Sequence, residues 1–220
     1  NYKTIMKKIK KALISVSDKK DLKNLLKVLT KYKIELISSG GTYKEIIKLK
    51  FKCLEVSEYT GSPEILDGRV KTLHPKIHAG ILSKRNNKSH NRDLKDNNFE
   101  KIDLVIVNFY PFEKTLEQTN NHLKIIENID VGGPTMVRAA AKNYNDVAVI
   151  TSSNQYSELI NEIENNNGST SINFREKMSS EAFSETAYYD AVISNYFSKI
   201  INNNFPKKKV IYGNLIEKLR

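Results

Sequence analysis

Cysteine and long apolar runs are what this chain of 220 residues most lacks. Its single cysteine, Cys53, excludes a disulfide within the chain and suits a reducing compartment. The longest apolar run, residues 102–109, contains polar residues and is far too short to cross a bilayer. The basic N-terminal segment also lacks the apolar stretch of a secretory signal. We therefore expect a cytoplasmic protein that does not contact membranes.

Metal-ligand patterns are missing as well. The chain has 4 histidines, and no set of histidine and cysteine has the spacing of a zinc site, so we predict no bound metal.

Hydrophobic residues make up 39% and charged residues 28%, a composition that excludes a disordered chain. The length suits one α/β domain with a core, with or without a tail.

Positive charge is abundant: the formal net charge of the chain is +11. A chain of this charge could bind nucleic acid, and steep dependence of binding on salt would be the sign of it. The lysines are however scattered among asparagines and isoleucines, and no RNA- or DNA-binding motif with interleaved aromatic residues occurs. We therefore favour a solvated coat of lysines and expect no nucleic-acid partner.

Short apolar runs alternate with segments of helical period along the chain. Leu22, Leu25, Leu26 and Leu29, for example, recur on one helical face after the first apolar run. We predict strands over residues 11–15, 34–38, 53–56, 102–109 and 147–150, helices over 134–144 and 155–163, and one or two long helices over 171–204. We interpret residues 165–171 as a flexible connector. Strands separated by helices predict a three-layer open, mainly parallel α/β sheet with helices on both faces, in which ligands bind beyond the carboxyl ends of the strands.

Two strand-to-helix turns could hold one phosphate. Ser39, Gly40, Gly41 and Thr42 join the second predicted strand to a helix, where free N–H groups and hydroxyls suit an anion. A Gly-Gly turn with a threonine cap is about as often purely structural. The neighbouring turn carries Ser15, Ser17 and Lys19, and a lysine in the first turn of a helix makes better sense with an anion nearby.

The segment DGRVKTLHP (residues 67–75) is dense in polar chemistry. Arg69 and Lys71 would share a face of an extended loop. An exposed basic loop is the alternative. We interpret His74 and His78 as packed or hydrogen-bonding residues rather than bases.

Two further tracts end strands or begin helices. Tyr110 follows the most buried strand, where it either presents its hydroxyl at the mouth of the sheet or packs. Asp130 precedes Gly132 and Gly133 and could be no more than a helix cap. Lys142 falls near the end of that helix, where a lysine suits the dipole regardless of catalysis.

Five segments resemble, in order and spacing, the cyclohydrolase half of the bifunctional AICAR transformylase/IMP cyclohydrolase family: ALISVSDK, ISSGGT, YTGSPEILDGRVKTLHPKIHAGIL, VNFYPF and IDVGGPTMVRAAAKN. The resemblance is close over residues 11–150 and looser beyond. GRVKTLHP and the last segment are highly specific, whereas ISSGGT is shared with methylglyoxal-synthase-like domains. Ser62 and Phe109 depart from the usual residues, and neither replaces a polar site residue.

The resemblance implies a methylglyoxal-synthase-like (Rossmann-like) fold and an activity. The substrate would be 5-formamidoimidazole-4-carboxamide ribotide (FAICAR), closed to inosine monophosphate (IMP) in the last step of de novo purine biosynthesis without any cofactor. The implied catalytic residues are Lys71, Tyr110, Asp130 and Lys142. The implied substrate-binding residues are Ser15, Ser17, Lys19, Ser39, Gly40, Gly41, Thr42, Arg69, Thr72, Asn108, Gly132 and Gly133.

The resemblance also implies partners and rival functions. We expect a cyclohydrolase domain over residues 11–204, and a linker over 205–220 toward a transformylase domain that carries formyl transfer in the same protein. In the family that half begins after a Leu-Arg pair, as at the end of this chain, and the first residue is not methionine, so we expect neighbouring sequence. The resemblance also implies a homodimer. The alternatives are a phosphate-ligand-binding module without catalysis and methylglyoxal synthase itself.

Overall fold

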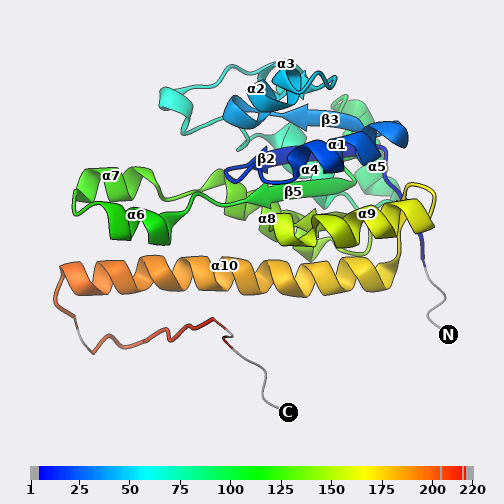
Figure 1. Ribbon diagram of the computed structural model, residues 1–220. Helices are drawn as coiled ribbons and strands as arrows, with labels where there is room; N and C mark the ends of the chain where they lie inside the picture. The colour runs from blue at the N-terminus through cyan, green and yellow to red at the C-terminus, as the bar shows by residue number, and fades with distance from the viewer. Residues whose placement is uncertain (1–4, 204, 215, 217–220) are drawn as a thin grey trace, which may run out of the picture.

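A computed structural model describes residues 5–203, 205–214 and 216 of the chain. Its centre is a parallel five-stranded sheet in the order β4-β3-β2-β5-β6 (Figure 1). The strands of this sheet are β2 (Lys11–Val16), β3 (Glu35–Ser38), β4 (Leu54–Glu55), β5 (Leu104–Asn108) and β6 (Ala148–Ile150). The strand order reverses beside β2, so the sheet is doubly wound, and the predicted fold class is confirmed.

Ten α-helices connect and cover the described strands. They are α1 (Leu22–Lys31), α2 (Gly40–Lys48), α3 (Val56–Thr60), α4 (Pro75–Leu82), α5 (Lys88–Asp96), α6 (Phe112–Gln118), α7 (His122–Glu127), α8 (Gly132–Lys142), α9 (Tyr156–Asn165) and α10 (Ile172–Ile200). Helix α8 packs against both α4 and α10, while α1 packs against α9. Right-handed crossovers put these two groups on opposite faces of the sheet, which gives three layers.

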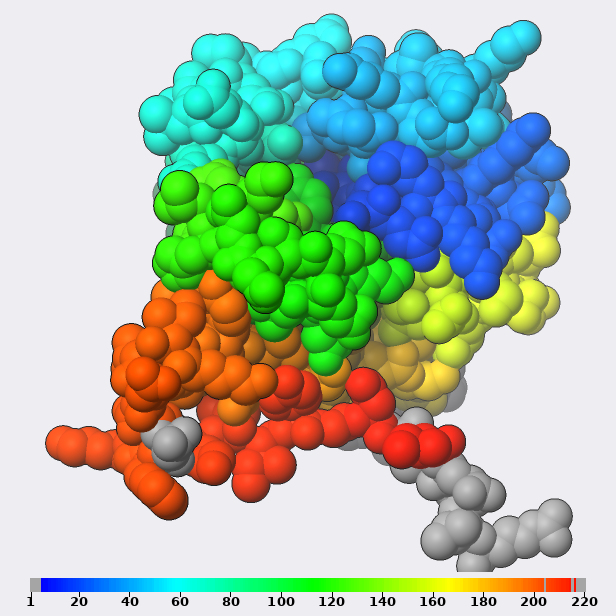
Figure 2. Space-filling view, turned by 60° about the vertical axis from the view of Figure 1, so that its left-hand side comes forward, coloured from blue at the N-terminus to red at the C-terminus, as the bar shows by residue number. Residues whose placement is uncertain are grey.

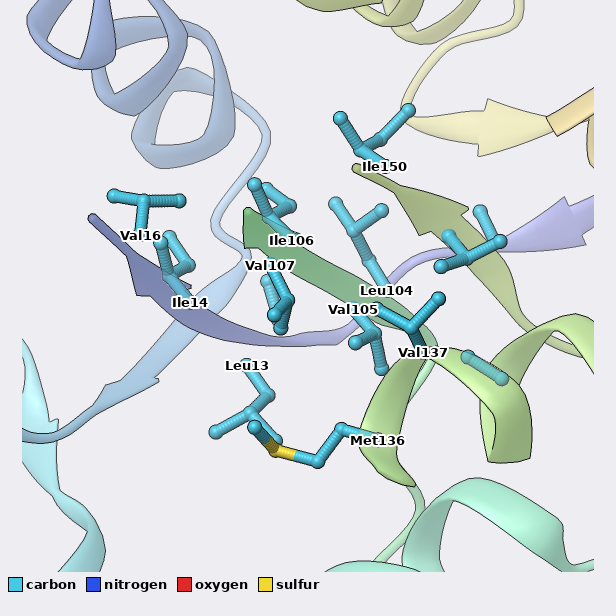
Figure 3. Close-up of a cluster of buried hydrophobic side chains, with 14 of the residues drawn as sticks. Leu13, Ile14, Val16, Leu104, Val105, Ile106, Val107, Met136, Val137 and Ile150 are labelled. Atoms are coloured by element: carbon cyan, nitrogen blue, oxygen red, sulfur yellow. The ribbon is translucent and has the colours of Figure 1, made fainter. Parts of the chain in front are cut away.

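The core lies on both faces of β2 and β5. Leu13 and Val105 point toward Met136 and Val137 of α8, whereas Ile14 and its neighbours on the pleat point the other way (Figure 3). The side chains of β5 from Leu104 to Val107 are at most 1% exposed, which explains the near-continuous apolar run in the sequence. On α1, the predicted apolar face is buried as expected.

Several predicted boundaries were wrong. The third strand covers only Leu54–Glu55, because α3 begins at Val56. Residues 57–72, to which no helix or strand was assigned from the sequence, contain most of α3, the 3₁₀ helix η1 (Leu66–Gly68) and an antiparallel bridge between Ile65 and Val70. Helices α4 to α7 were not predicted, because each has at most nine residues, too few turns for a helical period to stand out.

The segment interpreted as a flexible connector is ordered. β7 (Ser169–Thr170) pairs antiparallel with β1 (Lys7–Lys8), outside the main sheet. Gly168, at φ +80°, makes the turn before β7, and its carbonyl accepts a hydrogen bond from the Ile9 N–H. A second 3₁₀ helix, η2 (Ser153–Gln155), precedes α9. Pairing with β1, which is far away in the sequence, thus orders residues whose composition indicates a loop.

Helix α10 is one continuous helix of 29 residues that crosses the molecule beneath α8 (Figure 1). The tail after it turns back along the helix, as the orange and red surfaces show (Figure 2). Asn195 of α10 donates a hydrogen bond to the Val210 carbonyl, and the Tyr188 and Tyr212 rings meet edge to face. The described part of the tail therefore depends on α10 for its contacts.

Candidate functional site

The polar segments predicted to form a site meet at the carboxyl edge of the sheet. β2, β3 and β5 end at Val16, Ser38 and Asn108, and the loops that follow them lie side by side because the strands are parallel. In the space-filling view the blue, cyan and green segments border a recess (Figure 2).

The Gly-Gly turn forms the start of α2. Gly40 has a φ of +55°, a conformation that strongly favours glycine. Two ammonium groups lie beside it: a Cβ on Gly40 would be 3.5 Å from Lys71 Nζ, and one on Gly41 would be 4.0 Å from Lys19 Nζ. The first turn of α2 contains no acidic residue. Lysine charges and a helix N-terminus together make this an environment for an anion.

The side chain of Thr42 links the Gly-Gly turn to the neighbouring strand. Its hydroxyl accepts a hydrogen bond from the Val16 N–H and donates one to the Val16 carbonyl, both at 3.0 Å. These bonds tie the first turn of α2 to the end of β2. In the structure this hydroxyl donates inside the protein, and its expected role as a donor for phosphate stays a prediction.

Asn108 holds the loop after β2. Its side-chain oxygen accepts hydrogen bonds from the N–H groups of Ser17 at 2.5 Å and Asp18 at 2.9 Å, and its amide donates to the Asp18 carbonyl at 3.0 Å. Lys19 donates to the Ser17 carbonyl at 3.3 Å. The Asn108 side chain thus shapes the loop that presents Lys19, which the sequence did not predict.

The two basic residues of the GRVKT loop do not share partners. Arg69 forms an ion pair with Glu127 of α7, whereas Lys71 lies 3.7 Å from Glu64 and close to Gly40. The Lys71 side chain is 26% exposed, so it lines the recess without being solvated on all sides. Glu64 was missed from the sequence, although an acidic residue a few positions before two basic ones was the available signal.

Thr72 is packed in the interior, and His74 caps the helix that follows the loop. Thr72 is buried, and its Oγ1 would lie 2.6 Å from a Cβ on Gly132, so only glycine fits there without a shift. His74 Nδ1 accepts the N–H of Lys76 at the start of α4, and its Nε2 lies 3.2 Å from Ser62 Oγ. The capping role agrees with the structural interpretation of His74.

Asp130 lies at the start of α8. Its Oδ1 accepts the Gly133 N–H at 2.8 Å. Burial raises the pKa of the Asp130 carboxyl above its ordinary value, while the Gly133 and Tyr110 backbone groups and the charge of Lys71 oppose that rise. The same contacts show that the Tyr110 segment and Lys71 lie close to the carboxyl. A buried carboxyl with a raised pKa is a candidate for proton transfer.

Lys142 is the one predicted catalytic residue that the structure places apart from the others. It is the last residue of α8 and is exposed. At a helical rise of 1.5 Å per residue, it lies about 15 Å along the axis from Gly132. Helix α8 carries Lys142 toward the opposite edge of the sheet, so it does not contact Asp130 of the same chain, and its catalytic role stays a prediction.

Tyr189 was missed altogether. It comes from α10, and its hydroxyl accepts the Asp130 N–H at 2.9 Å. No sequence signal distinguishes it from the other aromatic residues of that helix, since its contact lies 59 positions away along the chain.

A separate cavity of about 500 Å³ lies at the amino edge of the sheet, beside the start of β2. Its charges are largely paired with one another: Lys11 lies 3.1 Å from Glu35 and also pairs with Glu100, and Arg85 lies 3.3 Å from Asp103. The groups suited to binding and proton transfer converge at the other edge, so we take the carboxyl edge as the candidate site.

Replacing Asp130 by asparagine should stabilise the fold increasingly as the pH rises from the ordinary carboxyl value of 3.8 toward neutrality. The folded pKa is raised, so between the two pKa values the folded state binds more protons than the unfolded state, and stability falls as the pH rises. The asparagine side chain has no proton to lose, and its oxygen can still accept the Gly133 N–H. Thermal melts of both proteins between pH 4 and pH 7 measure the difference.

Asp146 provides a matched control of opposite sign. Burial alone would raise the pKa of Asp146, but Lys7 and Arg85 lower it overall. Asp146→Asn should therefore lose stability relative to the wild type as the pH rises. The account of Asp130 would be wrong if both variants shifted in the same direction.

Two features are absent from the described residues. No helix among them is long and apolar enough to cross a membrane. No group of three or more histidine, cysteine, aspartate or glutamate side chains among them could hold a metal ion.

Comparisons with known proteins agree with the resemblance that the sequence motifs carry. Residues 21–135, just over half the chain, match the family described as MGS-like domain, and residues 140–220 match the family described as AICARFT/IMPCHase bienzyme.

Three similar relatives are each called bifunctional purine biosynthesis protein PurH. That of Bradyrhizobium diazoefficiens is 44% identical over 97% of this chain, that of Prochlorococcus marinus 51% over 86%, and that of Leptospira biflexa 45% over 98%. The chain spans 40%, 36% and 42% of their lengths. The crystal structure of ForH is 28% identical, with a TM-score of 0.76 over 86% of this chain and 99% of that one. The chain belongs to the family of MGS-like domains.

Proposed function

We propose that this chain is an IMP cyclohydrolase, which closes FAICAR to IMP with loss of water. The observation that carries the proposal is the convergence of Lys71, Asp130 and the Tyr110 segment beside the Gly40-Gly41 helix start. An anion subsite next to a buried acid and an ammonium group suits a phosphorylated substrate that must exchange protons. The PurH relatives, named for purine biosynthesis, support the same reaction.

The substrate phosphate would bind at the start of α2. Lys19 and the backbone of Ser39, Gly40 and Gly41 would hold it, with the Ser15 and Ser17 segment beside them. In this arrangement the hydroxyl of Thr42 keeps the turn in place and leaves the binding to backbone groups and lysines.

The ribose and base would lie between this turn and α8. Arg69 is exposed at one side, and Thr72 packs on the Gly132-Gly133 start of α8. Asn108 would act here through the loop that it shapes.

Ring closure requires the carboxamide nitrogen, a poor nucleophile, to attack the formyl carbon. A C–N bond forms, the carboxamide nitrogen loses one of its two protons, and the formyl oxygen is protonated to a hydroxyl group. The formamide nitrogen then loses its proton as the C=N bond forms and the C–O bond breaks, so that the hydroxyl departs as water. Lys71 and the Tyr110 hydroxyl would stabilise the negative charge that develops on the formyl oxygen, and Asp130 would take the amide proton. The reaction is intramolecular, so correct positioning of its two ends lowers the barrier strongly. None of these steps requires a metal ion or an organic cofactor.

The rest of the protein follows from the same proposal. Residues 11–204 would be the cyclohydrolase domain and residues 205–220 the link to a transformylase domain with AICAR formyltransferase activity. We also propose a homodimer in the cytoplasm, with a small-molecule substrate and neither nucleic acid nor membrane as partner. Size measurements on the chain and on the longer protein test the dimer.

Absorbance-monitored conversion of FAICAR to IMP by the purified chain tests the activity. Turnover supports the proposal. Binding of IMP without turnover would instead identify a phosphate-ligand-binding module. Release of methylglyoxal from dihydroxyacetone phosphate, measured in parallel, would indicate methylglyoxal synthase, and we expect none.

A further inference from the structure

Tyr189 lies at the junction of two segments that carry proposed catalytic residues. It projects from α10 and is only 7% exposed. Helix α10 falls within residues 140–220, which match the AICARFT/IMPCHase bienzyme family, and outside residues 21–135, which match the MGS-like domain. The helix thus lies outside the MGS-like match, and it reaches the carboxyl edge of the sheet.

The hydroxyl of Tyr189 holds the backbone that carries Asp130. It accepts the Asp130 N–H at 2.9 Å and donates to the Asn128 carbonyl at 3.3 Å. These two groups flank Ile129, in the short link between the end of α7 and the start of α8. A buried hydroxyl that satisfies two backbone groups fixes their separation, because losing either bond leaves a polar group without a partner.

The ring of Tyr189 supports the backbone that carries Tyr110. Its centroid lies 4.9 Å from that of Phe109 and 6.3 Å from that of Phe112, the residues on either side of the Tyr110-Pro111 pair. The Tyr110 backbone is in turn close enough to the Asp130 carboxyl to act on its charge. One side chain of α10 therefore contacts both segments at the point where they meet.

We propose that Tyr189 is a positioning residue for ring closure, which sets the placement of Asp130 relative to Tyr110 through its hydroxyl and its ring. The inference rests on the proposed function. It adds that the cyclohydrolase reaction depends on α10, which the MGS-like match does not include. Tyr189 itself does not touch the substrate. Its effect is exerted through the Asp130 backbone.

Tyr189→Phe tests the proposal, because it removes the hydroxyl and keeps the ring against Phe109 and Phe112. Tyr188→Phe is the matched control. The Tyr188 hydroxyl also makes two hydrogen bonds, donating to Glu113 at 2.7 Å and accepting from Asn214 at 3.1 Å, but these lie toward α6 and the tail. Circular-dichroism melts of both variants define an assay temperature well below either unfolding transition.

We expect Tyr189→Phe to lower kcat for conversion of FAICAR to IMP by about ten- to a hundredfold, the effect of a small misplacement of a reacting group. KM should stay nearly unchanged, because the phosphate subsite is on α2. Tyr188→Phe should change neither. Equal kcat in the wild type and Tyr189→Phe would overturn the inference, as would a rise in KM that accounts for the whole loss. A folded wild-type chain without turnover would contradict the proposed function first, and this inference would fall with it.

Discussion

Lys71→Ala should reduce the turnover of FAICAR to IMP by about a hundredfold to a thousandfold, the usual cost of removing one group that stabilises a developing oxyanion. Its ammonium group lies between the Gly40 turn and Glu64 and is close enough to Asp130 to affect that carboxyl. Alanine removes this charge from the place where we propose that the formyl oxygen becomes negative. The measurement is kcat and KM by absorbance, with a melt to show that the variant is folded.

Lys76→Ala is the control for loss of a nearby lysine. Lys76 lies in the first turn of α4, and its ammonium group is 4.8 Å from the centroid of the Tyr59 ring, outside the proposed site. We expect its turnover to match that of the wild type. If Lys71→Ala kept at least half of the wild-type kcat, the assignment of Lys71 would be wrong.

Arg175→Met should lower the free energy of unfolding by about 3 kcal/mol or more, since four backbone carbonyls, that of the buried Thr170 among them, lose a charged donor at once. Arg175 of α10 is fully buried. It donates to the carbonyls of Tyr144 at 2.7 Å, Ile5 at 3.0 Å and Asn145 at 3.1 Å, and also to that of Thr170. Burial lowers the pKa of its guanidinium to about 10, so it remains charged at neutral pH.

Lys177→Met is the matched control, two residues farther along α10. Its side chain is half exposed, with an ion pair to Glu158 at the surface, so the substitution should change stability little. Urea denaturation of both variants and the wild type gives the comparison. Equal midpoints for Arg175→Met and Lys177→Met would show that the Arg175 contacts add nothing to stability.

The core elements of the sheet could be predicted from local patterns. β5 is buried on both faces, so its residues are nearly all apolar, and α1 is buried on one side, so its leucines follow the helical period. Among the helices that were missed, α5 buries only Leu94, so its sequence shows no apolar face. β7 consists of Ser169 and Thr170, which form a strand only because β1 lies beside them.

The candidate site, like the fold, could be predicted from the sequence only in part. The two strand-to-helix turns and the start of α8 were identified because parallel strands bring their carboxyl ends to one edge, whatever the details of the fold. The arrangement of Asn108 and Thr42 could not be predicted, because each hydroxyl or amide could face a ligand or the backbone with equal local propensity. Which hydrogen-bond partner lies nearer to these side chains depends on where the folded structure places the neighbouring loop.

The sequence by itself determined the class of sheet, the edge at which the polar loops gather and the family resemblance, because these depend on periodicity and on motifs contiguous along the chain. Only the folded chain shows that Tyr189 lies beside Asp130, whereas the predicted helix already separates Lys142 from it. Along the chain Lys142 is the nearer of the two. A straight helix carries it about 15 Å away, while the long helix α10 returns across α8 and brings Tyr189 into contact.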